Sequence, residues 1–287
     1  MTNVFQRELK NHWYVQYNEM SFPAVQKGWV LEPGNWKEHD PFILLAEDWF
    51  KRGTFSDHPH RGFQTVTYVI DGRLEHIDNH GGQDILEPGD VQYMNAGSGA
   101  RHAEEAVDND IAHTLQLWLN LPKELKNTKA SYQNVYKEHA PVVPFEGGQV
   151  RVYSGEIGGV KGPLQSLVPF HLVEISLTAG SSYHLHLPEN HNAFVYVLSG
   201  DVLFGMNEIN LKKTGAATLT SKVDGKGEKE SELYIKANKR SKVLVYSGVP
   251  INEEVVAYGP FVMNTMDEIK EAYADYQAGK FGPPVKS

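Results

Sequence analysis

Two pairs of metal-ligand side chains, each spaced two residues apart, constrain this chain more than any other feature. The pairs are His58 and His60, followed by Arg61-Gly62, and His102 and Glu104. In a β-strand, residues two apart point to the same face. Two such strands lying side by side would direct three imidazoles and one carboxylate at a single point. Three nitrogens and one oxygen suit a borderline divalent metal.

The segments around both pairs carry strand and turn signals. Residues 63–70 are rich in β-branched and aromatic side chains and end at the turn pair Asp71-Gly72. A Pro-Gly turn precedes the period-two run at 91–94, and the glycine-rich turn at 95–99 delivers the chain to the second pair. Short strands separated by such turns predict an antiparallel β-barrel.

The same residues also have a purely structural interpretation. A lone histidine in a strand is more often a surface or core side chain, and Glu104 beside Glu105 fits a solvated acidic edge. Spacing alone leaves both interpretations open, because short motifs match by chance. His113 shares its parity with the apolar residues 115, 117 and 119, and we expect a packed or water-linked histidine there rather than a fifth ligand.

Several segments, in order along the chain, resemble the pirin family of cupins. They are His58-Pro59-His60-Arg61-Gly62-Phe63, Pro88-Gly89-Asp90-Val91-Gln92-Tyr93-Met94, Ala96-Gly97, His102-Ala103-Glu104 and Gly259-Pro260-Phe261-Val262-Met263-Asn264-Thr265. The resemblance implies an all-β fold of two tandem cupin barrels (double-stranded β-helix or jelly-roll) and a C-terminal helix that packs onto the N-terminal domain. We therefore predict an N-terminal cupin domain at 1–135 with the metal site and a metal-free C-terminal cupin domain at 136–287 that contributes this helix.

The resemblance also implies a ligand set and a chemistry. It implies that His58, His60, His102 and Glu104 hold one divalent metal, usually Fe(II), with Mn, Co, Ni, Cu or Zn as alternatives. A cupin glutamate shortly after the first pair is replaced by Gln64, which removes a candidate base near the metal. Sequence neighbours of the ligands are candidates for the pocket wall or for the core: Phe63, Tyr93 and Met94.

Some relatives oxygenate quercetin, and an animal relative is a nuclear transcription co-regulator. We therefore expect a dioxygenase of the quercetin 2,3-dioxygenase type, which cleaves a flavonol or similar enolisable aromatic with O₂ at a metal that keeps open positions. Glu104 is the predicted catalytic base. The alternative is a metal-dependent, redox-sensing regulatory protein that binds a protein partner.

The second half repeats the first weakly. Residues 68–72 match residues 196–200, which aligns His58 with His186 but His60 with Pro188. No histidine occurs in residues 192–287, so we predict a barrel that kept the fold and lost the metal. A divergent site is the less favoured alternative; it would use His184, His186, Glu189 and His191.

Composition and the chain ends limit the remaining possibilities. A net charge of −9 disfavours direct nucleic-acid binding, and the absence of cysteine excludes disulfides and thiolate metal sites. No stretch reaches the ~18 apolar residues that span a bilayer, and the first residues lack the apolar run of a signal peptide, so we expect a cytoplasmic protein. The polar stretch at 122–144 is predicted to connect the domains. Thr265 and Glu268 form a capping box that predicts a helix ending near Gly279.

Overall fold

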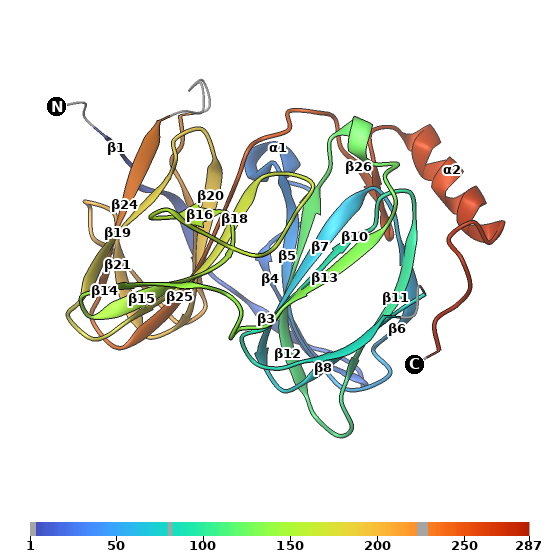
Figure 1. Ribbon diagram of the computed structural model, residues 1–287, viewed down its shortest axis with the longest axis horizontal. Coiled ribbons are helices and arrows are strands. Elements are labelled where there is room, and N and C mark those ends of the chain that lie inside the picture. Colours follow the sequence, from blue (N-terminus) through green and yellow to red (C-terminus); the bar gives the residue numbers. More distant parts are fainter. Residues whose placement is uncertain (1–3, 80–81, 223–228, 287) are drawn as a thin grey trace. The chain divides into compact units, whose positions relative to one another are not determined.

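The computed structural model describes residues 4–79, 82–222 and 229–286, which belong to two compact units (Figure 1). The unit that we name the first barrel comprises residues 16–137 and 251–287, and the second barrel comprises residues 1–15 and 138–250. Both are built mostly from strands, as predicted. These units differ from the predicted linear division, because a segment from each end of the chain belongs to the barrel of the other half. Within the described ranges, no helix is long and apolar enough to cross a membrane.

The first barrel consists of two antiparallel sheets of seven and four strands. The larger sheet has the order β13 (Ser131–Val135), β10 (Val91–Asn95), β7 (Phe63–Asp71), β12 (Ala112–Asn120), β5 (Phe42–Phe50), β4 (Ala24–Leu31) and β3 (Tyr17–Glu19). The smaller sheet has the order β6 (Phe55–His60), β11 (Ala100–Ala106), β8 (Leu74–Asp78) and β9 (Gln83–Leu86). The unit also contains α1 (Trp36–His39), the 3₁₀ turn η1 (Lys123–Leu125), and the hairpin of β26 (Val256–Tyr258) and β27 (Phe261–Met263). Because β13 lies inside the stretch predicted as a connection, part of that stretch is barrel.

The second barrel has the same two-sheet plan. Its larger sheet has the order β14 (Val142–Phe145), β15 (Gly148–Ser154), β18 (Phe170–Leu177), β25 (Ser241–Gly248), β20 (Asn192–Ser199), β23 (Gly215–Leu219) and β2 (Leu9–Tyr14). The smaller sheet contains β1 (Phe5–Gln6), β24 (Glu230–Ala237), β21 (Asp201–Phe204) and β22 (Ile209–Lys212), with β19 (Ser182–Pro188) also paired to β24. A short hairpin of β16 (Glu156–Ile157) and β17 (Val160–Lys161) completes the unit.

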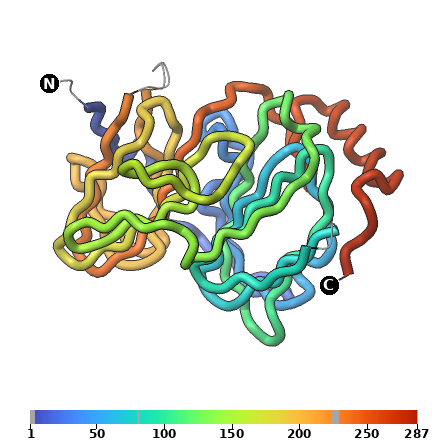
Figure 2. The backbone as a smooth tube through the Cα atoms, in the orientation of Figure 1, coloured from blue at the N-terminus to red at the C-terminus, as the bar shows by residue number. Residues whose placement is uncertain are grey.

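The strands of the two larger sheets correspond in order, and the smaller sheets correspond except for β1. The order β6-β11-β8-β9 of the first matches β19-β24-β21-β22 of the second, and β10-β7-β12-β5 matches β23-β20-β25-β18. One edge position is filled differently: β13 comes after the other strands of its sheet in the chain, whereas its counterpart β2 comes from the N-terminal segment, drawn in blue (Figure 2). The weak internal repeat in the sequence therefore reflects a duplicated architecture.

The interiors of the two barrels differ in polarity. Aliphatic side chains from both sheets fill the second barrel in one continuous cluster, which includes Val173, Val195 and Val245. The first barrel has apolar clusters around Phe50 and Val69 and beside β27 and α2, and its larger sheet buries further aliphatic side chains such as Leu45, Val66 and Leu117. Polar side chains occupy the interior between them.

The C-terminal helix α2 (Met266–Gln277) belongs to the first barrel, as the family resemblance implied. Thr265 and Glu268 form the predicted capping box, and Gly279 adopts a left-handed φ of 74° just beyond the helix. The helix buries Ile269 and Ala272 in a cluster with β27. Asp275 on the helix accepts a 2.8 Å hydrogen bond from Arg61, which fastens the helix to the end of β6.

Candidate metal centre

Neighbouring strands bring the three predicted histidine ligands together. Strands β6 and β11 are antiparallel, and His102 lies directly opposite His58. The ring centroid of His102 lies 4.5 Å from that of His58 and 5.1 Å from that of His60. One nitrogen from each of the three rings lies within 4.8 Å of the others, which is close enough for all three to bind one ion.

The predicted carboxylate Glu104 faces the same interior but is held differently. Its Oε1 accepts a 3.0 Å hydrogen bond from the Thr67 hydroxyl, and its Oε2 accepts one from the amide of Gln116. A carboxylate oxygen of Glu104 forms a second group of mutually close ligand atoms, within 4.8 Å, with His102 and His76. The four predicted side chains therefore share one interior but form two overlapping groups, with His102 common to both.

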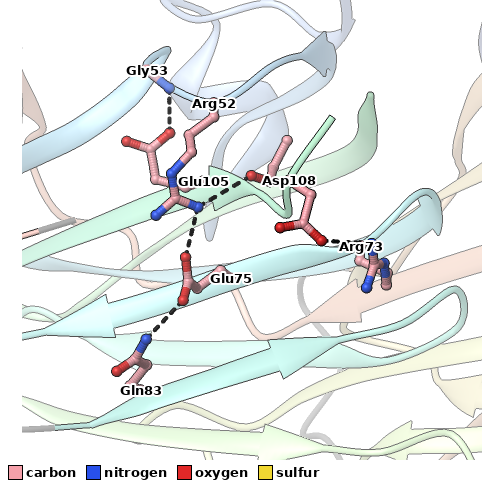
Figure 3. A network of polar contacts seen from close by, with 8 residues as sticks. Arg52, Gly53, Arg73, Glu75, Gln83, Glu105 and Asp108 are labelled. Atoms are coloured by element: carbon pink, nitrogen blue, oxygen red, sulfur yellow. Dashed lines mark hydrogen bonds and ion pairs between the residues drawn. The ribbon is translucent and has the colours of Figure 1, made fainter. Parts of the chain in front are cut away.

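Glu105 shows that the strand alternates as the sequence predicted. Although it is 1% exposed, its carboxylate points to the outer face of β11, where it accepts a 2.6 Å hydrogen bond from the backbone of Gly53 (Figure 3). Arg52 and Glu75 form an ion pair of 2.8 Å on the same face (Figure 3). Glu104 and Glu105 therefore do not form a solvated acidic edge. Glu104 points into the interior, and Glu105 joins a polar network on the outer face.

His76 is a site residue that the sequence interpretation missed. It lies on β8, opposite Glu104 on β11, and it is 3% exposed. A signal was present: His76 and Asp78 form a third i, i+2 pair of ligand types, just after the Asp71-Gly72 turn. The sequence alone does not distinguish this pair from an ordinary polar segment, because residues 75–80 are mostly polar.

Burial keeps the histidines neutral and raises the proton affinity of the carboxylate. Burial, with the neighbouring His58 and His60, holds the pKa of His102 well below its usual value. Burial raises the pKa of Glu104 to about 7, against the hydrogen bonds from Thr67 and Gln116. The His58 Nδ1 lies 2.7 Å from the carbonyl oxygen of Ser56, so its N–H donates there and Nε2 keeps the lone pair. Neutral imidazoles with free lone pairs are the form that binds metals.

These residues fit a divalent metal ion. Both ring nitrogens of His102 are buried without a hydrogen-bond partner in the described part of the chain, and its side chain is 0% exposed. Burying a polar group without a partner is costly, and native proteins rarely leave one so. A metal ion bound between the histidines would provide the missing partner.

A cavity of about 300 Å³ opens onto the candidate ligands. His58, His60 and Glu104 line its polar side. Apolar and aromatic side chains form much of the remaining wall; these include Trp29, Leu44, Phe50, Phe55 and Trp118.

Three residues that were candidates for the wall or for the core lie outside the cavity wall. Phe63 packs between the rings of His60 and Trp118 in an apolar cluster and does not line the cavity. Met94 packs in a separate small cluster. The Tyr93 hydroxyl donates a 2.6 Å hydrogen bond to Gln64, so both residues belong to another network. All three side chains are buried, which agrees with the core role that the sequence left open, because proximity in sequence to a ligand does not fix the direction of a side chain.

His113 is packed, as predicted. Its ring stacks on Trp49 with centroids 3.8 Å apart, and its Nε2 lies 2.7 Å from Glu47.

The remaining residues of the first motif fasten its strand. Gly62 has a φ of 86°, and a side-chain Cβ there would lie 2.0 Å from the backbone oxygen of Val262, so only glycine fits. The buried ammonium of Lys126 donates to the carbonyls of Gly62 and Val262 and to Asn120, at 2.7, 3.1 and 2.7 Å. These contacts tie the end of β6 to β27 and fix the position of the histidines.

The corresponding positions of the second barrel are apolar. On β19, the counterpart of β6, Leu185 and Leu187 are buried while His184 and His186 are exposed. The repeat alignment of His58 with His186 is therefore wrong by one residue, which reverses the face of the strand. On β24, the counterpart of β11, the inward residues are Leu233 and Ile235. This gives a physical reason for the prediction that metal binds only the first barrel.

Two cupin barrels, one of which gathers histidines and a carboxylate in its interior, define a bicupin with one candidate metal centre. The pirin family model matches residues 7–119, and the model of the pirin C-terminal cupin domain matches residues 172–282. Pirin of Rattus norvegicus is 38% identical over 247 residues, which cover 85% of this chain and 83% of the rat protein. This chain therefore belongs to the pirin family.

Two solved structures are also similar. GK1651 from Geobacillus kaustophilus is 43% identical, with a TM-score of 0.85, over 88% of this chain and 100% of that chain. A quercetin 2,3-dioxygenase from Acinetobacter baumannii is 30% identical, with a TM-score of 0.84, over 96% of this chain and 99% of that chain. The similarity extends over both barrels.

Proposed function

We propose that this protein is a metal-dependent dioxygenase of the quercetin 2,3-dioxygenase type, acting with O₂ on a flavonol or a similar enolisable aromatic. The observation that carries the proposal is a set of neutral imidazoles and one carboxylate at the wall of an aromatic-lined cavity. The similarity to the Acinetobacter baumannii quercetin 2,3-dioxygenase supports the same reaction class.

The ligands would be His58, His60, His102 and Glu104, and Fe(II) is the favoured ion. A bound divalent metal supplies Lewis acidity, which lowers the pKa of a coordinated hydroxyl group. Mn, Co, Ni, Cu and Zn also bind imidazole and carboxylate ligands and are the alternative ions for the same ligand set.

Glu104 is the proposed proton acceptor. Without a bound metal, burial raises the pKa of this carboxyl to about 7, so a Glu104 carboxylate that moves off the metal is suited to accept a proton near neutral pH. Thr67 and Gln116 orient the carboxylate, because each donates to a different oxygen. A substrate hydroxyl that loses its proton to Glu104 leaves an enolate, the electron-rich form that reacts with oxygen.

The cavity walls favour a flat aromatic substrate. Trp29 and Trp118 line the cavity together with Phe50 and Phe55. Lys27 lies over Trp29 at 4.1 Å from the ring centroid and 3.8 Å from the Asp48 carboxylate, which places one cation beside the cavity. A volume of about 300 Å³ is at the small end for ligand pockets, so a flavonol-sized molecule would fill it.

The test is oxygen uptake and loss of flavonol absorbance with purified protein loaded in turn with iron, manganese, cobalt, nickel and copper. We expect turnover of quercetin with at least one metal, and its loss in Glu104→Gln. The matched control is Glu105→Gln, one residue away on the outer face of the same strand, which retains turnover. Metal-loaded protein that consumes neither quercetin nor oxygen would refute the proposal and would favour the regulatory alternative.

A further inference from the structure

Among the residues that the structure describes, none hydrogen-bonds to either ring nitrogen of His76. Its side chain is 4% exposed, and both nitrogens are buried without a hydrogen bond. The nearest acidic group is Asp78, whose Oδ2 lies 3.9 Å from Nε2, beyond hydrogen-bond distance. The other oxygen of Asp78 accepts a 3.0 Å hydrogen bond from the backbone of Gly82. A buried imidazole in this state indicates a partner that binds through nitrogen.

The strand register directs His76 at two of the predicted ligands. β8 lies beside β11 on the side opposite to β6, with His76 across from Glu104 and Asp78 across from His102. The ring centroids of His76 and His102 are 5.3 Å apart. A nitrogen of His76, a nitrogen of His102 and an oxygen of Glu104 all lie within 4.8 Å of one another.

These three side chains are a two-histidine, one-carboxylate set. That set binds non-haem Fe(II) and leaves positions open for other ligands. His102 also belongs to the group with His58 and His60. Since a neutral imidazole has one lone pair, His102 serves one ion at a time. The two groups are thus alternative positions for a single ion.

We propose that His76 is a further metal ligand, and that His76, His102 and Glu104 form a second position for the ion, overlapping the one formed by His58, His60 and His102. The proposal rests on the metal centre assigned under the proposed function. The ion would be a borderline divalent cation, because such cations bind both imidazole nitrogen and carboxylate oxygen. A core role for His76, packed 5.3 Å from the ring of Tyr132, is the competing explanation.

The test uses Co(II), whose visible absorption reports coordination number, together with equilibrium dialysis for stoichiometry. The exposed pair His184 and His186 is changed to glutamine throughout, to remove adventitious binding on the surface of β19. On this background, His58→Ala/His60→Ala removes the first position. His76→Phe removes the second metal position and fills its space; it is made alone and in the His58→Ala/His60→Ala variant. His76→Gln is a polar replacement that serves if phenylalanine perturbs folding.

We expect the background protein to bind one equivalent. The double variant binds one equivalent about 10- to 100-fold more weakly, with a changed spectrum, and adding His76→Phe abolishes this binding. Thermal unfolding without metal confirms that each variant is folded. His12→Gln, at an exposed position, serves as the control and leaves binding unchanged.

Two results would overturn the inference. The first is a folded double variant that binds no Co(II) although the background protein binds one equivalent, a result that leaves the proposed function intact. The second is binding in the double variant that survives both His76→Phe and His76→Gln. A background protein that binds none of the metals would instead remove the proposed function, and the inference with it.

Discussion

Two buried histidines are expected to make the second barrel sensitive to acid. His171 and His191 point their Nδ1 atoms at the hydroxyl of Ser247, each at 3.2 Å, and their rings are 5.4 Å apart. Burial lowers the pKa of His171 to about 4, against a hydrogen bond from its ring to the backbone of Glu156. Burial, His171 and Arg7 lower the pKa of His191 to about 3. Both rings are therefore neutral in the folded barrel.

The sign of the effect follows from proton binding. Unfolded histidines take up a proton below about pH 6.5, whereas these two stay neutral in the folded state until the pH approaches 4. Over that window the unfolded chain binds more protons, so stability falls as the pH falls. At about 1.4 kcal/mol per pH unit and group, lowering the pH from about 8 to about 5 costs about 2 kcal/mol for each histidine and about 4 kcal/mol for both.

The assay is urea unfolding at about pH 8 and about pH 5, monitored by ¹⁹F NMR of protein labelled with fluorotryptophan. Of the five tryptophans, Trp13 belongs to the second barrel and reports its unfolding. We expect His171→Gln/His191→Gln to lose about 4 kcal/mol less than the wild type between the two pH values. The control replaces two exposed histidines, His12 and His139, and behaves as the wild type. Equal losses in the wild type and the buried double variant would refute the reasoning.

Four further outcomes are expected. Gly62→Ala, checked by thermal unfolding, destabilises the first barrel because its Cβ meets backbone, and an unchanged Tm would contradict the close approach. Lys126→Met removes the donor of three buried hydrogen bonds and also removes the cost of burying an ammonium group. We expect a net loss of about 2–4 kcal/mol in urea unfolding, and a neutral effect would contradict this. By metal analysis, His102→Ala loses most of the metal, whereas Glu104→Gln weakens metal binding modestly but abolishes turnover; full occupancy and turnover in Glu104→Gln would show that this carboxylate is neither ligand nor base. Finally, we expect metal analysis to find one equivalent per chain, bound in the first barrel. Two equivalents per chain, one of them surviving His58→Ala, would show that metal is not confined to the first barrel.

The period-two pattern predicted which face each candidate ligand occupies. His102 and Glu104 point inward and Glu105 outward, as alternation along β11 requires. The pattern also placed His113 among packed residues. The helix after Thr265 was predictable because its capping signals are local.

Neighbours across strands were beyond the sequence pattern. His76 joins the candidate site because β8 and β6 flank β11 on opposite sides. The pattern of residues along one sequence does not predict this order of strands in the sheet. The alignment of the two halves failed at His186 because one residue of slippage turns a strand over, and the loop between β19 and β20 differs from that between β6 and β7. The exchange of β2 escaped prediction for a similar reason: an edge strand carries no mark of the sheet it joins.

The two barrels divide stability and chemistry between them. The second barrel fills its interior with aliphatic side chains, including Leu185 and Leu233 at the positions that correspond to ligand strands. The first barrel instead buries imidazoles without partners and a carboxylate whose pKa is raised, and each such group costs folding free energy. Apolar clusters around Phe50 and against α2 form part of its core. Because those clusters do not include the candidate ligands, we expect removal of a bound metal to relax the site without unfolding the barrel.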